Sequence, residues 1–404
     1  MAKTLIIGGG IAGPVAAMAL QQAGIESVVY EAYGRGADAV GAFLTLAVNG
    51  LDALRTLGLH SLVQEHGFDT PRMAIYSGSG RTLAEFPNGK TLADGTVSQT
   101  IKRADLYRAL RDEAIRRGIR IEYGKRLASA ERTPQGVLAR FEDGSEAHGA
   151  RLIGADGLQS RTRQIIDPGA PAARYVGLLN TGGYARGATV AGEPGTIYMI
   201  FGKRAFFAYM PHPNGEVWWF ANPPMAREPT REELAAISPQ RWRAELIECF
   251  AGDTSPAVDL IEATEEIIAP WATYDLPSVP VWHNGRMIVI GDAAHATSPA
   301  SGQGASMAIE DALVLAKSLR DVPDTAQAFA TYERQRRSRV ERVVAQGKRN
   351  GDYKAVGPVA RAVRDLVLPI AFKLITRGGR DPQAWLTDYH IAWNTSVEPA
   401  ARAA

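Results

Sequence analysis

Three glycines near the start of the chain have the spacing of a dinucleotide-binding turn. Gly8, Gly10 and Gly13 follow the apolar run Leu5–Ile7 in the pattern G-x-G-x-x-G and open a segment rich in small residues. The first glycine permits a tight turn, the second lets a pyrophosphate reach the backbone, and the third lets a helix pack on a strand. Glu31 stands 18 positions after Gly13, where a carboxylate can accept both ribose hydroxyls. The pattern predicts that the chain binds NAD or FAD.

Two further segments place small residues where a strand turns into a helix. They are GADGLQSRTR at 154–163 and GDAAHATSPASGQGASMAIEDA at 291–312, and each follows or includes the end of an apolar run. Small side chains let a ligand approach the backbone, and a helix start offers free N–H groups and the positive end of a dipole. Asp292 ends the second apolar run, at the sheet edge where ligands of open α/β sheets bind. The small residues of the second segment therefore predict a ligand that lies against the backbone there.

Composition narrows the class of protein. The 404 residues carry a net charge of only +2, which gives no tract for nucleic acid, and the single Cys249 suits a reducing compartment. No stretch reaches the roughly 18–20 apolar residues of a membrane span, and the N-terminus reads as strand and helix rather than a secretion signal. No residue cluster has metal-ligand spacing. We expect a cytoplasmic monomer or homodimer with no metal, membrane span or nucleic-acid partner.

The pattern along the chain predicts two interleaved domains. Residues 4–31 read as strand, helix and strand, and such a crossover makes the strands parallel. Residues 73–97 and 176–274 contain alternating apolar and polar runs between turn signals, as antiparallel strands do. The arginine-rich stretch 334–342 is expected to be a solvated helix face. The expected parts are a Rossmann-like α/β domain of residues 1–72, 98–175 and 275–340, a β-rich substrate domain of residues 73–97 and 176–274, and C-terminal helices over 341–404.

Together the three motifs resemble the fingerprints of a known family. GGGIAG with YEA, GADGLQSRTR, and GDAAHATSPASGQG occur in the order found in class A flavoprotein aromatic hydroxylases of the p-hydroxybenzoate and salicylate hydroxylase type. The resemblance implies bound FAD, NADH or NADPH as a transient reductant, and O₂ as co-substrate. It also implies hydroxylation of an aromatic or polycyclic substrate, natural products included, through a C4a-hydroperoxyflavin. With a single G-x-G-x-x-G, no second Rossmann domain is expected for the nicotinamide.

The resemblance carries FAD contacts onto individual residues. The family's arginine at the position of Arg103 reaches the FAD pyrophosphate, and the family's aspartate at the position of Asp292 holds the ribityl chain. The segment Pro299–Gly304 begins a helix whose N–H groups face the flavin's pyrimidine edge and stabilise the charge that reduction places there. The residues expected to bind FAD are Gly8, Gly10, Ala12, Gly13, Glu31, Arg103, Leu127, Asp156, Asp292, Gly302, Gly304 and Ala305.

Three neighbours of these residues are expected to act differently. Arg163 is predicted to be structural, pairing across two segments of the dinucleotide-binding domain. His295 is predicted to take part in the hydrogen bonding of its turn rather than in catalysis. Ser306 stands where many relatives carry asparagine. We expect flavin binding to survive that departure.

The substrate is expected on the β-rich domain, facing the flavin. Alternation in AFFAYMP puts Phe207 and Tyr209 on one face, and Trp218 and Trp219 must point in opposite directions. These four residues are the expected lining, and Tyr209 and Pro299 are the candidate catalytic positions. Salicylate-type relatives often carry a histidine four residues before such a tyrosine, where Ala205 stands here. That departure favours a bulkier or already activated substrate.

Two other functions stay open at this point. One is an FAD-dependent dehydrogenase or oxidase that inserts no oxygen. The other is a non-catalytic flavin-binding protein that sequesters a ligand, although the intact Gly8, Glu31, Asp156 and Asp292 argue against it. Flavin halogenation is disfavoured, since the W-x-W-x-I-P signature is absent.

Overall fold

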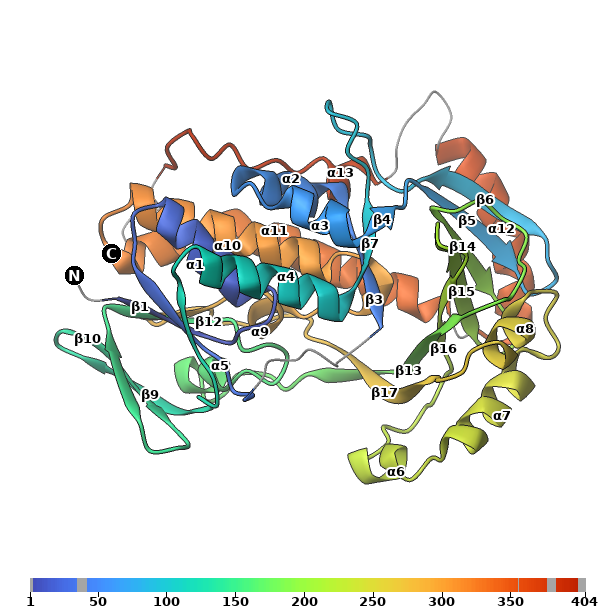
Figure 1. The fold of residues 1–404 in the computed structure, drawn as a ribbon, viewed down its shortest axis with the longest axis horizontal. Coiled ribbons are helices and arrows are strands. Elements are labelled where there is room, and N and C mark those ends of the chain that lie inside the picture. The colour runs from blue at the N-terminus through green and yellow to red at the C-terminus, as the bar shows by residue number, and fades with distance from the viewer. Residues whose placement is uncertain (1–2, 35–41, 355, 376–382, 399–404) are drawn as a thin grey trace.

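Two sheets organise the chain, and the predicted fold class is confirmed (Figure 1). The computed structural model describes residues 3–34, 42–354, 356–375 and 383–398. The first sheet is parallel, which follows from the strand–helix–strand crossovers of the sequence. Its strands lie in the order β18 (Met287–Val289), β12 (Arg151–Gly154), β1 (Thr4–Ile7), β2 (Ser27–Tyr30) and β8 (Arg120–Glu122).

Both faces of the parallel sheet are covered, which explains why its strands are apolar without alternation. Ile6 packs on one side, in a core shared with α1 (Ala12–Gln22), α4 (Arg103–Arg116) and α10 (Gly304–Asp321). Leu5 and Ile7 pack on the other side, against an antiparallel meander. The strands of that meander are β9 (Leu127–Thr133), β10 (Gly136–Phe141) and β11 (Glu146–Gly149).

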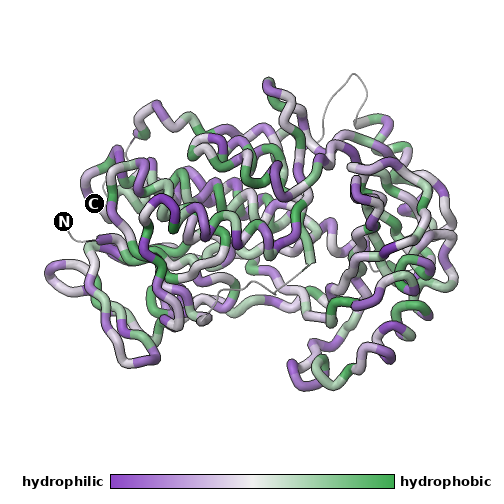
Figure 2. Tube along the Cα trace, viewed as in Figure 1, coloured by the Kyte–Doolittle hydropathy of each residue, from purple (hydrophilic) through white to green (hydrophobic). Residues whose placement is uncertain are grey.

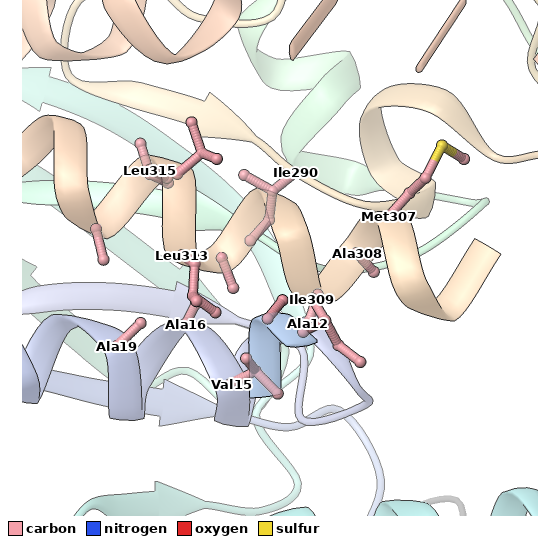
Figure 3. Close-up of a cluster of buried hydrophobic side chains, with 14 of the residues drawn as sticks. Ala12, Val15, Ala16, Ala19, Ile290, Met307, Ala308, Ile309, Leu313 and Leu315 are labelled. Carbon is pink, nitrogen blue, oxygen red and sulfur yellow. The ribbon is translucent and has the colours of Figure 1, made fainter. Parts of the chain in front are cut away.

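Small residues bring α1 and α10 close together under the parallel sheet. Figure 3 shows Ala12, Ala16 and Ala19 of α1 pointing toward α10, which contributes Ala308 and Ile309. All five side chains are at most 9% exposed, and alanine lets two helix backbones approach each other. Both helices begin close to the carboxyl ends of parallel strands, so two helix N-termini meet at one edge of the sheet.

The second sheet is mostly antiparallel and extends to the right in Figure 1. Its strands lie in the order β17 (Ile268–Asp275), β13 (Arg174–Ala185), β16 (Val217–Asn222), β15 (Phe206–Pro211), β14 (Thr196–Phe201), β5 (Arg72–Ser77) and β6 (Thr82–Pro87). One face is covered by helices that the β-rich reading of residues 176–274 did not foresee. They are α6 (Arg231–Ala235), α7 (Pro239–Phe250) and α8 (Ala257–Glu262).

A third, small sheet and the remaining helices complete the fold. A small sheet has the order β3 (Phe43–Leu46), β7 (Gln99–Lys102) and β4 (Phe68–Asp69), next to α2 (Val48–Thr56) and α3 (His60–His66). Later elements are α5 (Arg161–Ile166), α9 (Asp292–His295), the 3₁₀ turn η1 (Pro299–Ser301), α11 (Thr325–Asp352), α12 (Pro358–Ile375) and α13 (Ala384–Thr387). The boundary expected at residue 340 therefore falls inside α11.

Hydrophobic and hydrophilic residues alternate along the long helices, as they do in helices that bury one face (Figure 2). Within the described residues, no helix is both long and apolar enough to cross a membrane.

Candidate cofactor and substrate site

The N-terminal turn has the shape that a pyrophosphate needs. Gly8 has a φ of +108°, and a Cβ there would lie 2.3 Å from the Ala155 carbonyl oxygen. A Cβ on Gly13 would lie 1.9 Å from the carbonyl oxygen of Gly8, so the turn admits glycine alone at both places. A Cβ on Gly10, in contrast, would meet no atom within 4 Å. Since no side chain caps α1 either, its N–H groups face open space suited to an anion.

Glu31 holds this turn from the end of β2. Its Oε2 accepts a hydrogen bond from the backbone N–H of Gly9 at 2.6 Å, and its Oε1 accepts one from Tyr33 at 2.9 Å. The residue is 8% exposed. Each carboxylate oxygen retains a second lone pair, so Glu31 can still accept ribose hydroxyls as the sequence predicts.

Arg103 and Asp292 share the electrostatic environment of Glu31. The Arg103 Nε donates to the hydroxyl of Tyr107 at 2.7 Å, one turn further along α4. Burial raises the pKa of Tyr107; the Arg103 cation opposes this, and the Asp292 and Glu31 carboxylates add to it. The structure thus gathers three expected FAD contacts around a tyrosine that sequence analysis did not single out. The sequence could have indicated this contact, because Tyr107 lies four residues after Arg103 and therefore on the same face of the helix.

Asp156 is engaged within its own turn. Its Oδ1 accepts from the Ser160 hydroxyl at 2.6 Å, and its Oδ2 accepts from the backbone N–H and the hydroxyl of Thr162, both at 2.9 Å. Burial raises the pKa of Asp156, and these hydrogen bonds oppose that shift. The carboxylate therefore shapes the start of α5, and a contact of Asp156 with FAD stays a prediction. Leu127, at the start of β9, is 5% exposed and packs in the meander core.

The structural role predicted for Arg163 is confirmed. Its guanidinium donates to the carbonyl of Ala293 at 3.0 Å and to that of Leu158 at 2.8 Å. Ala293 follows Asp292 in α9, so Arg163 ties the second glycine-rich segment to the third. The two segments are thereby held in register at the sheet edge.

The third segment presents an uncapped helix start. Pro299 begins η1, Gly302 has a φ of +64°, and a Cβ on Gly302 would enter open space. Gly304 and Ala305 then begin α10, whose first turn has no side-chain cap. Asp292 is exposed at the same edge. The exposed Asp292, the open space beside Gly302 and the uncapped N–H groups at the start of α10 fit the ribityl chain and the ring of a flavin.

A buried ion network lies beneath that helix start. The Arg336 guanidinium donates to Asp311 Oδ1 at 2.7 Å and to Glu310 Oε2 at 2.6 Å, with all three side chains 0% exposed. Asn49 bridges Glu310 to Gln303, the residue before α10, at 2.6 and 2.9 Å. The expectation of a solvated arginine face is therefore wrong for Arg336. The sequence did hold one indication that Arg336 is buried, because the residue falls in line with the apolar positions of α11.

His295 belongs to the same network. Its Nε2 lies 2.5 Å from Asp311 Oδ2, which also accepts from the backbone N–H of Gly291 at 2.8 Å. Burial alone would raise the pKa of Asp311, but His295 and Arg336 outweigh it and lower that pKa. The prediction that His295 serves the hydrogen bonding of its turn is confirmed. Ser306 is 1% exposed, and a Cβ on Gly50 would meet its Oγ at 2.6 Å.

The substrate-lining prediction does not match the structure for three residues. Phe207, Tyr209 and Trp219 lie in the core between the second sheet and helices α7 and α8. The Tyr209 hydroxyl donates to the carbonyl of Ala191 at 3.1 Å, and the Trp219 indole donates to Thr264 at 2.8 Å. Alternation defines two faces of a strand but does not say which one meets the flavin, since both are apolar here.

The opposite face of the sheet turns toward the FAD-binding part. We call the side chains Phe43, Tyr184, Phe206, Trp218 and Phe220 the aromatic face. Phe43 comes from β3, and its ring centroid lies 5.4 Å from that of Trp218 and 6.0 Å from that of Phe220. Of the four predicted lining residues, only Trp218 belongs to it. Ala205 is fully buried in the α7–α8 core, so its identity carries no information about substrate ionisation.

Replacing Tyr209 by phenylalanine is expected to leave turnover unchanged. The change removes one hydrogen bond and should cost about 0.5–1.5 kcal/mol of stability. Steady-state kinetics and urea unfolding of the variant measure both effects. A large fall in kcat without loss of FAD would restore a catalytic role for Tyr209.

Comparison with known proteins agrees with this site. A family model described as an FAD binding domain matches residues 1–347. The FAD-dependent urate hydroxylase of Klebsiella pneumoniae is 33% identical over 361 residues, which cover 87% of this chain and 90% of that protein. The 3-amino-4-hydroxybenzoate 2-monooxygenase PtnB3 of Streptomyces platensis is 34% identical over 411 residues, covering 96% of both.

A solved structure extends the likeness to three dimensions. Klebsiella pneumoniae HpxO complexed with FAD and uric acid matches with a TM-score of 0.82 and 29% identity, over 94% of this chain and 95% of that one. The chain belongs to the FAD-binding-domain family, among its FAD-dependent monooxygenases.

Proposed function

We propose that this enzyme hydroxylates a small planar aromatic or heteroaromatic compound, bound between the aromatic face and the segment Pro299–Gly304. The observation that carries this proposal is the orientation of the aromatic face, which turns its rings toward the FAD-binding part through Phe43. Aromatic rings favour offset-stacked or edge-to-face contacts with another ring. Both relatives cited above are named for small ring compounds, urate and 3-amino-4-hydroxybenzoate, which supports a substrate of that size.

The chain's own residues prepare the site for the cofactor. FAD, when bound, supplies hydride acceptance from NADH or NADPH and insertion of one oxygen atom from O₂. Glu31 and the start of α1 would hold its adenosine and pyrophosphate, and Asp292 its ribityl chain. The uncapped start of α10 would stabilise negative charge on the ring without reorganising. The rings of the aromatic face, of which Phe206 and Trp218 are buried, would keep water away from the reaction, since water would otherwise decompose the reactive oxygen species.

A ligand screen with mass analysis tests the proposal. Aromatic compounds, monocyclic and polycyclic, are added to the FAD-loaded enzyme, and consumption of NADH and NADPH is followed. At least one compound is expected to accelerate consumption and to yield a product heavier by one oxygen atom. Oxidised product without added oxygen would identify a dehydrogenase or oxidase instead. A flavin that no ligand renders reducible would favour a sequestering protein.

Location and assembly belong to the same proposal. A cytoplasmic location is supported by the single Cys249, which provides no internal disulfide, and by the need for reduced nicotinamide. For the assembly we propose a monomer or a homodimer. Fractionation of cells and light scattering of the purified enzyme measure the two properties.

A further inference from the structure

Lys354, which follows the end of α11, places its amino group among uncharged side chains. Its Nζ lies 4.0 Å from the ring centroid of Phe206 and 5.6 Å from that of Phe220, both on the aromatic face. Phe206 is 1% exposed, so an amino group over its ring lies deep in the protein even though Lys354 as a residue is partly exposed. The neighbouring Tyr353 is 55% exposed, which shows that solvent is close along the chain. The lysine nevertheless points inward.

A buried amide network fixes how Lys354 is held. Its Nζ donates to Oδ1 of Asn222 at 2.6 Å. The Asn222 amide nitrogen donates to Asn180 Oδ1 at 2.6 Å, and Asn180 donates to Thr273 at 2.6 Å. These three partners are 3–6% exposed. Because Asn222 offers an oxygen, it accepts one N–H of Lys354, and among the described residues it is the only hydrogen-bond partner of that nitrogen.

The charged groups on the surrounding elements have other partners. Asp352 pairs with Lys348 at 2.7 Å, and Arg364 of α12 pairs with Asp365 at 2.7 Å. Strands β15 and β16 contribute no charged residue, and the one titratable group there, Tyr209, lies on the opposite face. Burial lowers the pKa of Lys354 to about 7. A sizeable fraction of the amine is therefore unprotonated at neutral pH, and that fraction grows as pH rises.

The end of α11 also touches the flavin-facing segment. Asn350 donates to the carbonyl of Ala300 in η1 at 3.0 Å. A Cβ on Gly347 would lie 2.7 Å from Thr297 Oγ1, so glycine lets the helix approach this segment closely. Lys354 stands one helical turn beyond Asn350 and reaches the aromatic face. The end of α11 therefore contacts both of the surfaces between which we propose that the substrate binds.

We propose that Lys354 is the base that accepts a proton from a ring O–H or N–H of the substrate and pairs with the resulting anion. This inference rests on the proposed function, and it restricts the substrate to weakly acidic aromatic compounds. The O–H or N–H bond breaks, its electron pair stays on the ring substituent, and the proton moves to Nζ, which becomes an ammonium ion. The added electron density on the ring favours attack on an electrophilic oxygen.

The test uses 4-nitrophenol, which turns yellow on ionisation, with the FAD-loaded enzyme in weakly buffered solution at neutral pH, where part of the Lys354 amine is unprotonated. Difference spectra are expected to show bound nitrophenolate in the wild type and bound neutral phenol in Lys354→Met. Lys348→Met, which lies near the end of α11 and pairs with the exposed Asp352, is the matched control and should behave like wild type. Lys354→Arg keeps a cation over the rings, so it should bind the anion while releasing the proton to the buffer.

Kinetics with a substrate from the screen give a second readout. The kcat/KM of Lys354→Met is expected to be about 100-fold lower than that of wild type, with flavin content unchanged. The pH profile of kcat/KM should also lose the ionisation near neutral pH that we assign to Lys354. Wild-type enzyme that leaves nitrophenol neutral or unbound, or a methionine variant with the wild-type spectrum, would overturn the role of Lys354. Yellow nitrophenol without any oxygenated product would instead overturn the proposed function alone.

Discussion

Replacing Arg336 by leucine is expected to destabilise the protein by about 3–5 kcal/mol, because it leaves the buried Asp311 carboxylate without its arginine partner. Asp311 and Glu310 are both 0% exposed; Glu310 would keep its ion pair with Arg339, whereas Asp311 would keep the contact with His295 and the Gly291 N–H but lose its arginine. Urea unfolding of the cofactor-free protein measures the change. Since Asp311 also holds the segment before Asp292, the variant should lose FAD affinity as well.

An exposed ion pair provides the comparison. Arg241 and Glu245 pair at 2.7 Å on the surface of α7, with side chains 69% and 41% exposed. Replacing Arg241 by leucine should cost less than about 1 kcal/mol. Equal stability of the Arg336→Leu variant and the wild type would show that the network does not support the fold.

Replacing Gly10 by valine is expected to yield a folded but colourless protein. No atom lies within 4 Å of a Cβ at Gly10, so the cofactor-free fold should tolerate the side chain. The valine would occupy the space through which the pyrophosphate reaches the start of α1. Loss of two charge-assisted hydrogen bonds, at about 1.5–3 kcal/mol each, weakens FAD binding by at least about 100-fold. Fluorescence titration with FAD measures the affinity.

The control for this change is a glycine far from the site. Gly252 is exposed in the second domain, and a Cβ there would meet one side-chain atom at 3.9 Å. Gly252→Val should bind FAD normally. If Gly10→Val bound FAD as tightly as the control, the pyrophosphate could not lie at this turn.

Sequence reasoning succeeded where the determinants are local. The turn at Gly8 and Gly13 belongs to a motif of fixed length, and Arg163 belongs to another such motif, even though its partner Ala293 lies 130 residues further along the chain. It failed where the answer depends on what packs against a surface. Tyr209 and Trp219 lie under α7 and α8, and nothing in strands β15 or β16 indicates which face those helices cover. The same limit concealed Arg336, which has the polarity of a surface residue but lies in the apolar stripe of α11.

The strand order has a consequence for how the protein is made. The turn at Gly8 is synthesised long before β12, β18 and α10, yet β1 pairs with β12, β12 pairs with β18, and α10 packs against α1. For most of its synthesis, a nascent chain therefore has only the N-terminal part of the FAD site and lacks the strands and helix that complete it. FAD should bind late in synthesis, after α10 has been made. Fragments that end before α10 should contain no FAD.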